Sequence, residues 1–388
     1  MFTGRIKGIN IGSWLLMEGY ILGGRNIPES RFKQDFRKSY GLRGLQEFEE
    51  IFRNTYITED DFQNIAAISA NAIRLPFNCR LIETKPYTYT ERGFIFLDKA
   101  FAWAKKHNLG VILDLHAARG AQNCDWHGDS DGKAHFWENA EFRDRTCALW
   151  EKVADRYKSH PALIGYDVLN EPVIAKERED ALRKFYAKAV KRIRAVDKKH
   201  RIFLEGNLWA TRIDFLSDLL LDDEITISIH AYEPLSYTFN FTPFLRFPGT
   251  MDAETWDATR IARYLTTYAD FARKHKTRIF VGEFGINWRG GFWGEAQWLE
   301  AMLEAFDSWG FEYTYWTYKA VAGHAFPDGL YQFLPNNKYV RREGPVFGWE
   351  NYITLWKKER SQIIDSWKTW NFTPNQEIIA SLRRHFKG

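Results

Sequence analysis

Two stretches, IGYDVLNEP at residues 164–172 and FVGEFGI at residues 280–286, define the expected architecture. Each places a glutamate, Glu171 or Glu283, where a short apolar run ends. Pro172 removes a backbone donor and biases Glu171 away from helical geometry, so the first run is expected to be a strand that stops there. Gly282 and Gly285 flank Glu283 and permit close approach of backbone or ligand. Two carboxylates at two strand ends can face one bond.

Similar apolar runs recur along the chain, each followed by a loop and an amphipathic segment, in the order expected of β/α units. We expect helices at Glu59–Ser69, Phe94–His107, Phe142–Lys158, Asp180–Val196, Trp256–His275 and Glu295–Trp309. The runs are Arg5–Ile11, Ala72–Pro76, Gly110–Leu115, Leu163–Leu169, Arg201–Glu205, Thr226–Ile229, Arg278–Gly282 and Tyr313–Thr317. Eight alternations predict an α/β fold, a closed (β/α)8 TIM barrel.

Such a barrel takes about 250 residues, so a chain of 388 has spare length. The excess falls in residues 117–138, 233–255 and 320–348, which we expect to form long loops at the carboxyl face and to wall a pocket. The last forty residues read as a final helix near Gln376–Phe386 plus a packing extension. We therefore predict a single catalytic domain over residues 1–388, with a short C-terminal helical extension.

Composition argues against several other classes of protein. The formal net charge is +4, from 54 basic and 50 acidic side chains spread along the chain, so nucleic acid is not an expected partner. Three cysteines are too few for a disulfide framework or a zinc site. No leader precedes the first strand-like run and no run is apolar enough to span a bilayer, so we expect no membrane association and a cytoplasmic location, unless a leader was removed. The oligomeric state stays open.

The paired glutamates suit the cleavage of a glycosidic bond. One carboxyl must protonate the departing oxygen while the other supports or attacks the developing oxocarbenium carbon. The 16 Trp, 18 Tyr and 30 Phe would supply stacking surfaces for sugar rings, although most aromatic side chains simply pack in a core. A structural alternative is that buried Glu283 pairs with Arg74 and only holds the barrel together.

At its strand ends the chain resembles glycoside hydrolase family 5, in which paired glutamates end the fourth and seventh strands. The resemblance runs through every expected barrel strand but the fifth. It implies that Glu171 is the acid/base and Glu283 the nucleophile of a retaining mechanism, and that no cofactor or metal is needed. Eight positions match the pattern of the family: Arg74, His116, Asn170, Glu171, His230, Tyr232, Glu283 and Trp316.

The resemblance also implies supporting roles. Arg74 and Tyr232 would hydrogen-bond Glu283 and keep it ionised. Asn170 would grip the sugar 2-hydroxyl, a contact that strengthens in the transition state. Of the remaining matches, His116 and His230 would bind hydroxyls or tune the carboxylates, and Trp316 would stack on the bound ring.

The first unit, GINIGSWLLMEG at residues 8–19, is similar to the exo-β-1,3-glucanase branch of the family. In that branch a glutamate at this spacing binds hydroxyls of the terminal glucose, which makes Glu18 a candidate specificity residue. Residues 115–123 also resemble the branch, although Arg119 stands where its pattern carries a proline. Beyond them the sequence departs, and Asp125 and Trp126 are the nearest substitutes for its sugar-binding aspartate and stacking aromatic.

We therefore expect a retaining β-glycoside hydrolase that acts from chain ends on β-linked gluco-oligosaccharides or β-glucosides, with β-1,3 linkages favoured. Alternatives within the family are an endo-β-1,4-glucanase or a mannan- or glycolipid-active hydrolase. A metal-dependent hydrolase using His116, His127 and His135 is a rival, but neither His-x-His nor His-Glu-x-x-His spacing occurs. A carbohydrate-binding barrel without turnover is the non-enzymatic alternative.

Overall fold

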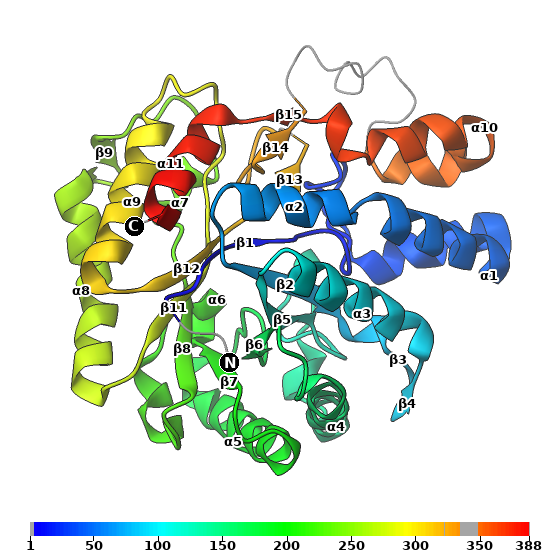
Figure 1. Cartoon of the computed structure of the whole chain (residues 1–388), viewed down its shortest axis with the longest axis horizontal. Helices are drawn as coiled ribbons and strands as arrows, with labels where there is room; N and C mark the ends of the chain where they lie inside the picture. The colour runs from blue at the N-terminus through cyan, green and yellow to red at the C-terminus, as the bar shows by residue number, and fades with distance from the viewer. Residues whose placement is uncertain (1–3, 322, 334–347, 388) are drawn as a thin grey trace.

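The computed structural model describes residues 4–321, 323–333 and 348–387 (Figure 1). Eight parallel strands close into a barrel in the order β1-β12-β11-β8-β7-β6-β5-β2, which confirms the predicted (β/α)8 architecture. Each predicted run coincides with one barrel strand. The strands are β1 (Lys7–Asn10), β2 (Ala72–Asn78), β5 (Gly110–Ala117), β6 (Leu163–Asp167), β7 (Arg201–Glu205), β8 (Ile225–His230), β11 (Ile279–Phe284) and β12 (Glu312–Tyr315).

The barrel strands are buried along their whole length, because helices cover the sheet from outside and side chains fill it from inside. An inner cluster of Ile6, Ala72, Ile112, Ile164, Phe203 and Phe280 closes the amino end of the barrel. Arg74, Asp114, Asp167, Glu205 and Glu283 lie toward the carboxyl end, where the catalytic face of this fold is built. At the amino end, Arg201 and Glu312 form a separate buried ion pair.

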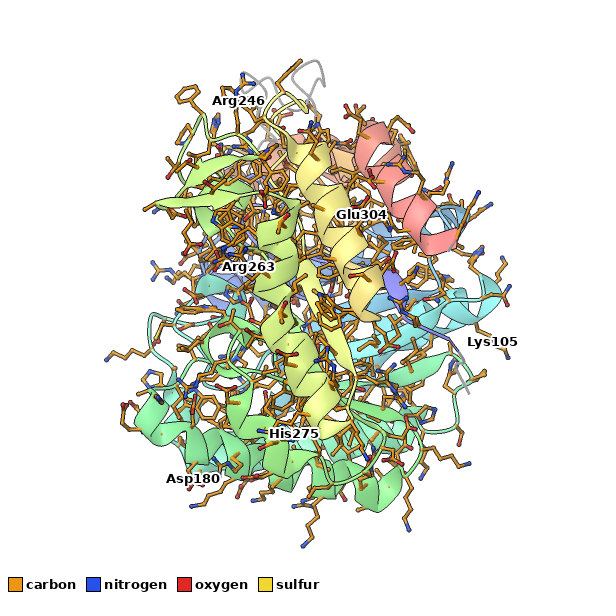
Figure 2. All side chains as sticks on the ribbon, turned by 90° about the vertical axis from the view of Figure 1, so that its left-hand side faces the viewer. Lys105, Asp180, Arg246, Arg263, His275 and Glu304 are labelled. Atoms are coloured by element: carbon orange, nitrogen blue, oxygen red, sulfur yellow. The ribbon has the colours of Figure 1, made fainter. Side chains whose placement is uncertain are left out.

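The predicted helices are present as α2 (Glu59–Ala67), α3 (Glu91–Lys106), α4 (Ala140–Tyr157), α5 (Glu179–Val196), α8 (Ala258–His275), α9 (Glu295–Trp309) and α11 (Gln376–Lys387). The helices α3, α4 and α8 begin at other residues than expected, because an N-cap side chain fixes each start. Thr90, Asn139 and Asp257 each accept a hydrogen bond from a backbone N–H of the first turn. Figure 2 shows α8 and α9 side by side, with Arg263, His275 and Glu304 labelled on them.

Two helices were not predicted, α1 (Glu29–Thr55) and α10 (Glu350–Ser366), which pack together at one side of the barrel (Figure 1). Gly41, at φ 71°, breaks the helical geometry of α1. Phe36 and Phe48 of α1 contact Trp356 of α10 edge to face, and Trp356 stacks on Trp367. Trp356 and Trp367 are thus packing residues of this extension, whereas Trp370 is 72% exposed.

The long loops carry short elements of their own. Residues 117–138 contain 3-10 turns at Trp126–Gly128 and His135–Trp137. Residues 233–255 contain α7 (Leu235–Thr238), β9 (Gly249–Met251) and the start of β10 (Glu254–Trp256). Of the predicted loop 320–348, residues 322 and 334–347 lie outside the described residues. The remaining short elements are β3 (Glu83–Lys85), β4 (Thr88–Tyr89), α6 (Asn207–Ala210), β13 (Lys319–Ala320), β14 (Tyr331–Gln332) and β15 (Thr373–Pro374).

No helix in the described part of the chain combines the length and the apolar character needed to cross a bilayer.

Candidate active site

A cavity of about 540 Å³ opens at the carboxyl face of the barrel. Nine of the eleven predicted site residues line it, and Arg74 and Asn170 do not. Both of these lie beneath the cavity, fully buried. The lining residues among the predictions are Glu18, His116, Asp125, Trp126, Glu171, His230, Tyr232, Glu283 and Trp316.

Glu283, at the end of β11, is held at both oxygens. The Arg74 guanidinium donates to Oε1 at 2.7 Å, and the Tyr232 hydroxyl donates to Oε2 at 2.8 Å. Only 4% of Glu283 is exposed. These are the two contacts that the resemblance implied, and they fix the carboxylate in one orientation.

Arg74, on β2, is the centre of a buried ion cluster. Its guanidinium lies 2.8 Å from Asp167, 2.9 Å from Glu205 and 3.1 Å from Asp114. It also donates to the side-chain oxygen of Asn170 at 2.8 Å. Burial raises the pKa of Asp167, and neighbouring Glu205 adds to the rise, so one acid of the cluster is protonated more readily than an exposed aspartate.

Glu171 follows β6 in a left-handed backbone conformation, at φ 45°, which is uncommon for a residue other than glycine. We expected Pro172 to bias Glu171 away from helical geometry and to end the strand. The observed conformation is stabilised by Glu205, whose carboxylate accepts the backbone N–H of Glu171 at 2.6 Å. The strained turn aims the side chain into the cavity, and such strain is typical of functional sites.

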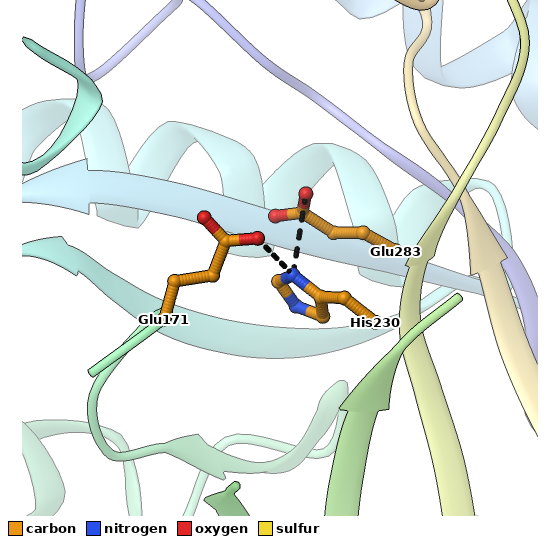
Figure 3. Close-up of side chains that lie close together, drawn as sticks. All are labelled: Glu171, His230 and Glu283. Carbon is orange, nitrogen blue, oxygen red and sulfur yellow. Dashed lines mark hydrogen bonds and ion pairs between the residues drawn. The ribbon is translucent and has the colours of Figure 1, made fainter. Parts of the chain in front are cut away.

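His230, from β8, lies between the two glutamates (Figure 3). Its Nδ1 is 2.7 Å from Glu171 Oε1 and 3.6 Å from Glu283 Oε2. The closest oxygens of Glu171 and Glu283 lie within 4.8 Å of each other. His127 approaches the other oxygen of Glu171, with Nε2 at 3.4 Å from Oε2.

The protonation of this group follows from its contacts. Burial favours the neutral form of Glu171, but His230, His127 and His116 outweigh it and lower the pKa of Glu171 to about 2. Burial acts against a charged His230, yet Glu205, Glu283 and Glu171 raise the pKa of His230 well above its usual value. These contacts favour a cationic His230, one hydrogen bond away from the Glu171 carboxylate.

His116 and Trp316 form another side of the cavity. Their rings stack with centroids 5.4 Å apart and planes 12° apart. His116 Nδ1 lies 2.7 Å from Asp114, and the Trp316 indole donates to the hydroxyl of Tyr20. Asn170 Nδ2 faces His116 Nε2 at 3.4 Å. The predicted contact of Asn170 with a sugar hydroxyl therefore stays a prediction, since Asn170 is buried below the lining residues.

Glu18 follows β1 and is 2% exposed, and its Oε1 has no hydrogen-bond partner in the structure. Burial raises the pKa of Glu18 to about 7, although His116 and His127 act in the opposite direction. A buried carboxyl with a free oxygen in a cavity is costly unless a ligand satisfies it. Its position supports the sequence-based prediction of a specificity residue.

Asp125 and Trp126 line the cavity as expected, but Asp125 is already engaged. The indole of Trp209 donates to Asp125 Oδ2 at 2.8 Å, and His127 Nε2 lies 3.6 Å from the same oxygen. Burial by itself would lower the pKa of His127, but Asp125 and Glu171 raise it to about 9. His127 is therefore a cation held between two carboxylates.

Sequence reasoning missed several of these groups. Asp114, Asp167 and Glu205 are acids within or at the end of otherwise apolar strands, which is the signal that identified Glu283, so they could have been found. His127 and Trp209 lie in loops, and nothing in their spacing indicates that they meet Asp125. Their contacts depend on the loop conformations.

Two groups of three potential metal ligands lie within 4.8 Å among the described residues: Glu171, His230 and Glu283, and Asp114, Asp167 and Glu205. The Arg74 guanidinium occupies the centre of the second group. The histidines named for the metal-hydrolase alternative are not gathered in either group. His135 instead approaches Asp131 and Glu138 in its own loop, at 3.6 and 3.5 Å.

Comparison with known proteins gives relatives of several named activities. The chain is 32% identical over 244 residues to a protein named β-xylosidase from Phanerodontia chrysosporium, covering 62% of this chain and 51% of that protein. It is 26% identical over 326 residues to Endoglucanase C from Acetivibrio thermocellus, covering 74% and 91%. It is also 26% identical over 244 residues to a probable glucan 1,3-β-glucosidase A from Aspergillus fumigatus, covering 60% and 56%.

The fold has solved counterparts. A structure of Cel5A from Thermotoga maritima in complex with cellobiose matches with a TM-score of 0.64 at 19% identity, covering 97% of each chain. The chain spans about half the length of the β-xylosidase and of the glucosidase. Residues 33–321 match the model of the family described as cellulase, glycosyl hydrolase family 5. The chain therefore belongs to glycosyl hydrolase family 5, a family of glycosidases.

Proposed function

We propose that this protein is a retaining β-glycosidase that works by double displacement. The observation that carries the proposal is the pair Glu171 and Glu283, whose closest oxygens lie within 4.8 Å across one cavity. Retaining enzymes place the two carboxyls about 5 to 5.5 Å apart, whereas inverting enzymes need about 6.5 to 9.5 Å to admit a water. The separation supports direct attack by one carboxylate.

Glu283 is the nucleophile in this proposal. Its oxygen attacks the anomeric carbon and forms a glycosyl ester, while the bond to the leaving oxygen breaks and that oxygen takes a proton. Arg74 and Tyr232 each hold one of its oxygens, so the carboxylate is oriented before substrate arrives. Water then cleaves the ester, and the sugar is released with its original configuration.

Glu171 is the acid/base. In this proposal His230 carries the proton, and the acid step draws it across the 2.7 Å hydrogen bond between His230 Nδ1 and Glu171 Oε1. When Glu283 attacks, its carboxylate loses its negative charge. A cationic His230 then loses part of the electrostatic attraction that stabilises it. The proton is thereby released toward Glu171 and the leaving oxygen as the bond breaks. The same pair later takes a proton from the attacking water.

The substrate class follows from Glu18 and the loops. The free, buried oxygen of Glu18 supports recognition of sugar hydroxyls at the end of a chain. The cavity of about 540 Å³ suits one or two sugar rings rather than a long polymer. We therefore propose exo-action on β-linked gluco-oligosaccharides or β-glucosides, with β-1,3 linkages favoured. The relative named Endoglucanase C supports endo-action as the second candidate, and the relative named β-xylosidase supports a pentose as an alternative sugar.

The test is product analysis by proton NMR with β-1,3- and β-1,4-linked glucotrioses. Initial β-glucose from one substrate supports retention, exo-action and that linkage. Internal cleavage that yields β-anomers supports the endo alternative. A panel of 4-nitrophenyl β-glycosides of glucose, xylose, mannose and galactose identifies the sugar. The proposal is wrong if the first product is the α-anomer, or if no β-glycoside is cleaved.

A further inference from the structure

We infer that the leaving-group side of the cavity binds an apolar alkyl or aryl group rather than a second sugar. This inference rests on the proposed function and deepens it, because it names the class of aglycone. The observation behind it is a division of the cavity into two unlike halves.

The two halves rise from opposite strands. In the closed order of eight strands, β7 stands four places from β1 in either direction. The half above β1 presents Glu18, with its free carboxylate oxygen, and Tyr20. The half above β7 and β8 presents Leu208, Trp209 and Leu235. A ligand that spans the cavity thus meets the free carboxylate oxygen of Glu18 at one end, beside the rings of Trp316 and Phe326, and mainly apolar side chains at the other.

The acid/base indicates which end receives the leaving group. Glu171 follows β6, the neighbour of β7, and must lie beside the oxygen that departs. Its Oε2 is 3.4 Å from His127, which lies 3.6 Å from Asp125, and Asp125 accepts the indole N–H of Trp209. This sequence of contacts leads from Glu171 directly to the apolar half.

The apolar half is built by a strained turn. Leu208, Trp209 and Ala210 are consecutive residues with φ between 53° and 61°, a region that non-glycine residues rarely adopt. Asn207 holds the turn, because its side chain bridges the backbone of Ile174 and the N–H of Leu208. Strain of this kind persists only where the surroundings enforce it, and it is concentrated at functional sites.

The strained turn presents apolar surface instead of hiding it. Leu208 is 38% exposed, Trp209 46%, and Leu235 and Phe241 on the neighbouring loop 40% and 56%. Exposed apolar side chains gathered along one cavity wall mark a binding surface. Trp209 and Phe241 offer ring faces to either kind of group, whereas leucine has none on which a sugar could stack, so the two leucines favour an aliphatic or aryl group over a saccharide.

Most polar groups of this wall are already engaged within the protein, although the Tyr264 hydroxyl, which also lines the cavity, has no hydrogen-bond partner among the described residues. The Trp209 indole donates to Asp125, and the Thr211 hydroxyl donates to the backbone oxygen of Leu208 at 2.7 Å. Glu233 accepts the backbone N–H of Leu235 at 3.2 Å. A second sugar would bring several hydroxyls to a wall with few free partners, which costs affinity.

The experiment compares octyl and methyl β-glycosides of the sugar identified by product analysis, at concentrations below those at which the octyl compound forms micelles. Both leaving groups are simple alcohols of similar acidity, so the chemistry is matched and the apolar area differs. Burial of one methylene is worth about fourfold, from ~0.8 kcal/mol. We expect kcat/KM for the octyl glycoside to exceed that for the methyl glycoside at least tenfold.

Variants at Leu208 and Leu235 test whether these side chains cause the preference for the octyl glycoside. Leu208→Asn removes apolar surface while asparagine tolerates the left-handed backbone, and Leu235→Asn makes the same change on α7. Each is expected to lower the octyl-to-methyl ratio at least threefold. Phe292→Ala is the matched control, because Phe292 is 77% exposed and does not line the cavity, and its ratio should equal that of the wild type.

The outcomes separate the two proposals. A wild-type ratio near one, unchanged ratios in both leucine variants, or faster cleavage of the matching β-linked disaccharide than of the octyl glycoside would overturn the aglycone inference and leave the glycosidase proposal standing. Failure to cleave any aryl, alkyl or saccharide β-glycoside would overturn both.

Discussion

Glu283 and Glu171 face one cavity, but the groups around them differ in kind. Arg74 and Tyr232 hold the carboxylate of Glu283 at 2.7 and 2.8 Å. Beneath it lies the floor of the cavity, by which we mean the fully buried charged side chains on the barrel strands: Arg74, Asp114, Asp167 and Glu205. Glu171 has one short contact, to His230, and a longer one to His127 in a loop. The difference indicates that the floor fixes the geometry of attack, whereas the loops adjust proton transfer and leaving-group binding and can vary without unfolding the barrel.

Loss of the nucleophile should have the largest effect. Glu283→Gln removes the attacking charge but keeps the shape and the hydrogen-bonding capacity of the side chain, so turnover should fall by at least ~10⁴-fold while sugar binding persists. Steady-state kinetics and calorimetric titration with the product sugar check this. Near-normal turnover in Glu283→Gln would contradict the assignment of the nucleophile.

Loss of the acid should depend on the substrate. Glu171→Ala should lower kcat/KM for an alkyl glycoside by about 10² to 10⁴-fold, because an alkoxide needs a proton to depart. A 2,4-dinitrophenyl glycoside carries an acidic leaving group and should lose much less in its glycosylation step. Equal losses for the two substrates would refute the acid role.

Removal of the Arg74 guanidinium should lower the free energy of unfolding. Arg74→Met leaves Asp114, Glu205 and Glu283 without their buried partner, and breaking such a cluster costs about 3–5 kcal/mol of the free energy of unfolding. Chemical denaturation measures the loss. Arg273→Met breaks an exposed pair with Asp270 and is the matched control, with an expected loss of at most ~1 kcal/mol. Similar losses in both variants would show that the cluster contributes no more than a surface pair.

The smallest expected effect is a shift in the pH dependence of kcat/KM when His127, a loop residue, is replaced. A cationic His127 lowers the pKa of Glu171, so His127→Asn should raise the affinity of the Glu171–His230 pair for its proton. The alkaline limb of kcat/KM reports loss of that proton and should therefore move to higher pH, by about one unit. His135→Asn, in the same loop but outside the cavity, should leave the limb in place. A lower kcat with an unmoved limb would mean that His127 has only a structural role.

The floor was largely predictable from the sequence, because strands impose their own geometry. Glu171 and Glu283 stand at or near strand ends, and parallel strands of a closed barrel bring their carboxyl ends to one face. Arg74, expected at the end of the second strand, lies within β2 and reaches Glu283 through its long side chain. The helix α1 was missed for a physical reason. It lies in the extension with α10, and its buried aromatic face is completed by residues more than 300 positions away, a pairing that local periodicity does not reveal.

The loop residues that line the cavity could not be predicted in the same way. Asp125 and Trp126 were expected at the cavity, and they line it, but the contact of Asp125 with Trp209 joins two loops across 84 positions. Gly206 and Asn207 signal a turn, but the sequence does not indicate that Leu208, Trp209 and Ala210 take left-handed geometry, because none of them is glycine. Loop residues acquire their roles from tertiary contacts, and these were read from the structure.

The most direct test of the central claim is to trap the covalent intermediate. In a 2-deoxy-2-fluoro β-glycosyl fluoride of the identified sugar, the fluorine at C2 slows both steps. The anomeric fluoride is a good leaving group and keeps the first step faster than the second, so the glycosyl ester accumulates. Intact-mass measurement followed by peptide mapping should find one sugar on each chain, attached to Glu283. Attachment to Glu171 or to another side chain, or turnover of the reagent without any adduct in a chain that inverts configuration, would contradict double displacement through Glu283.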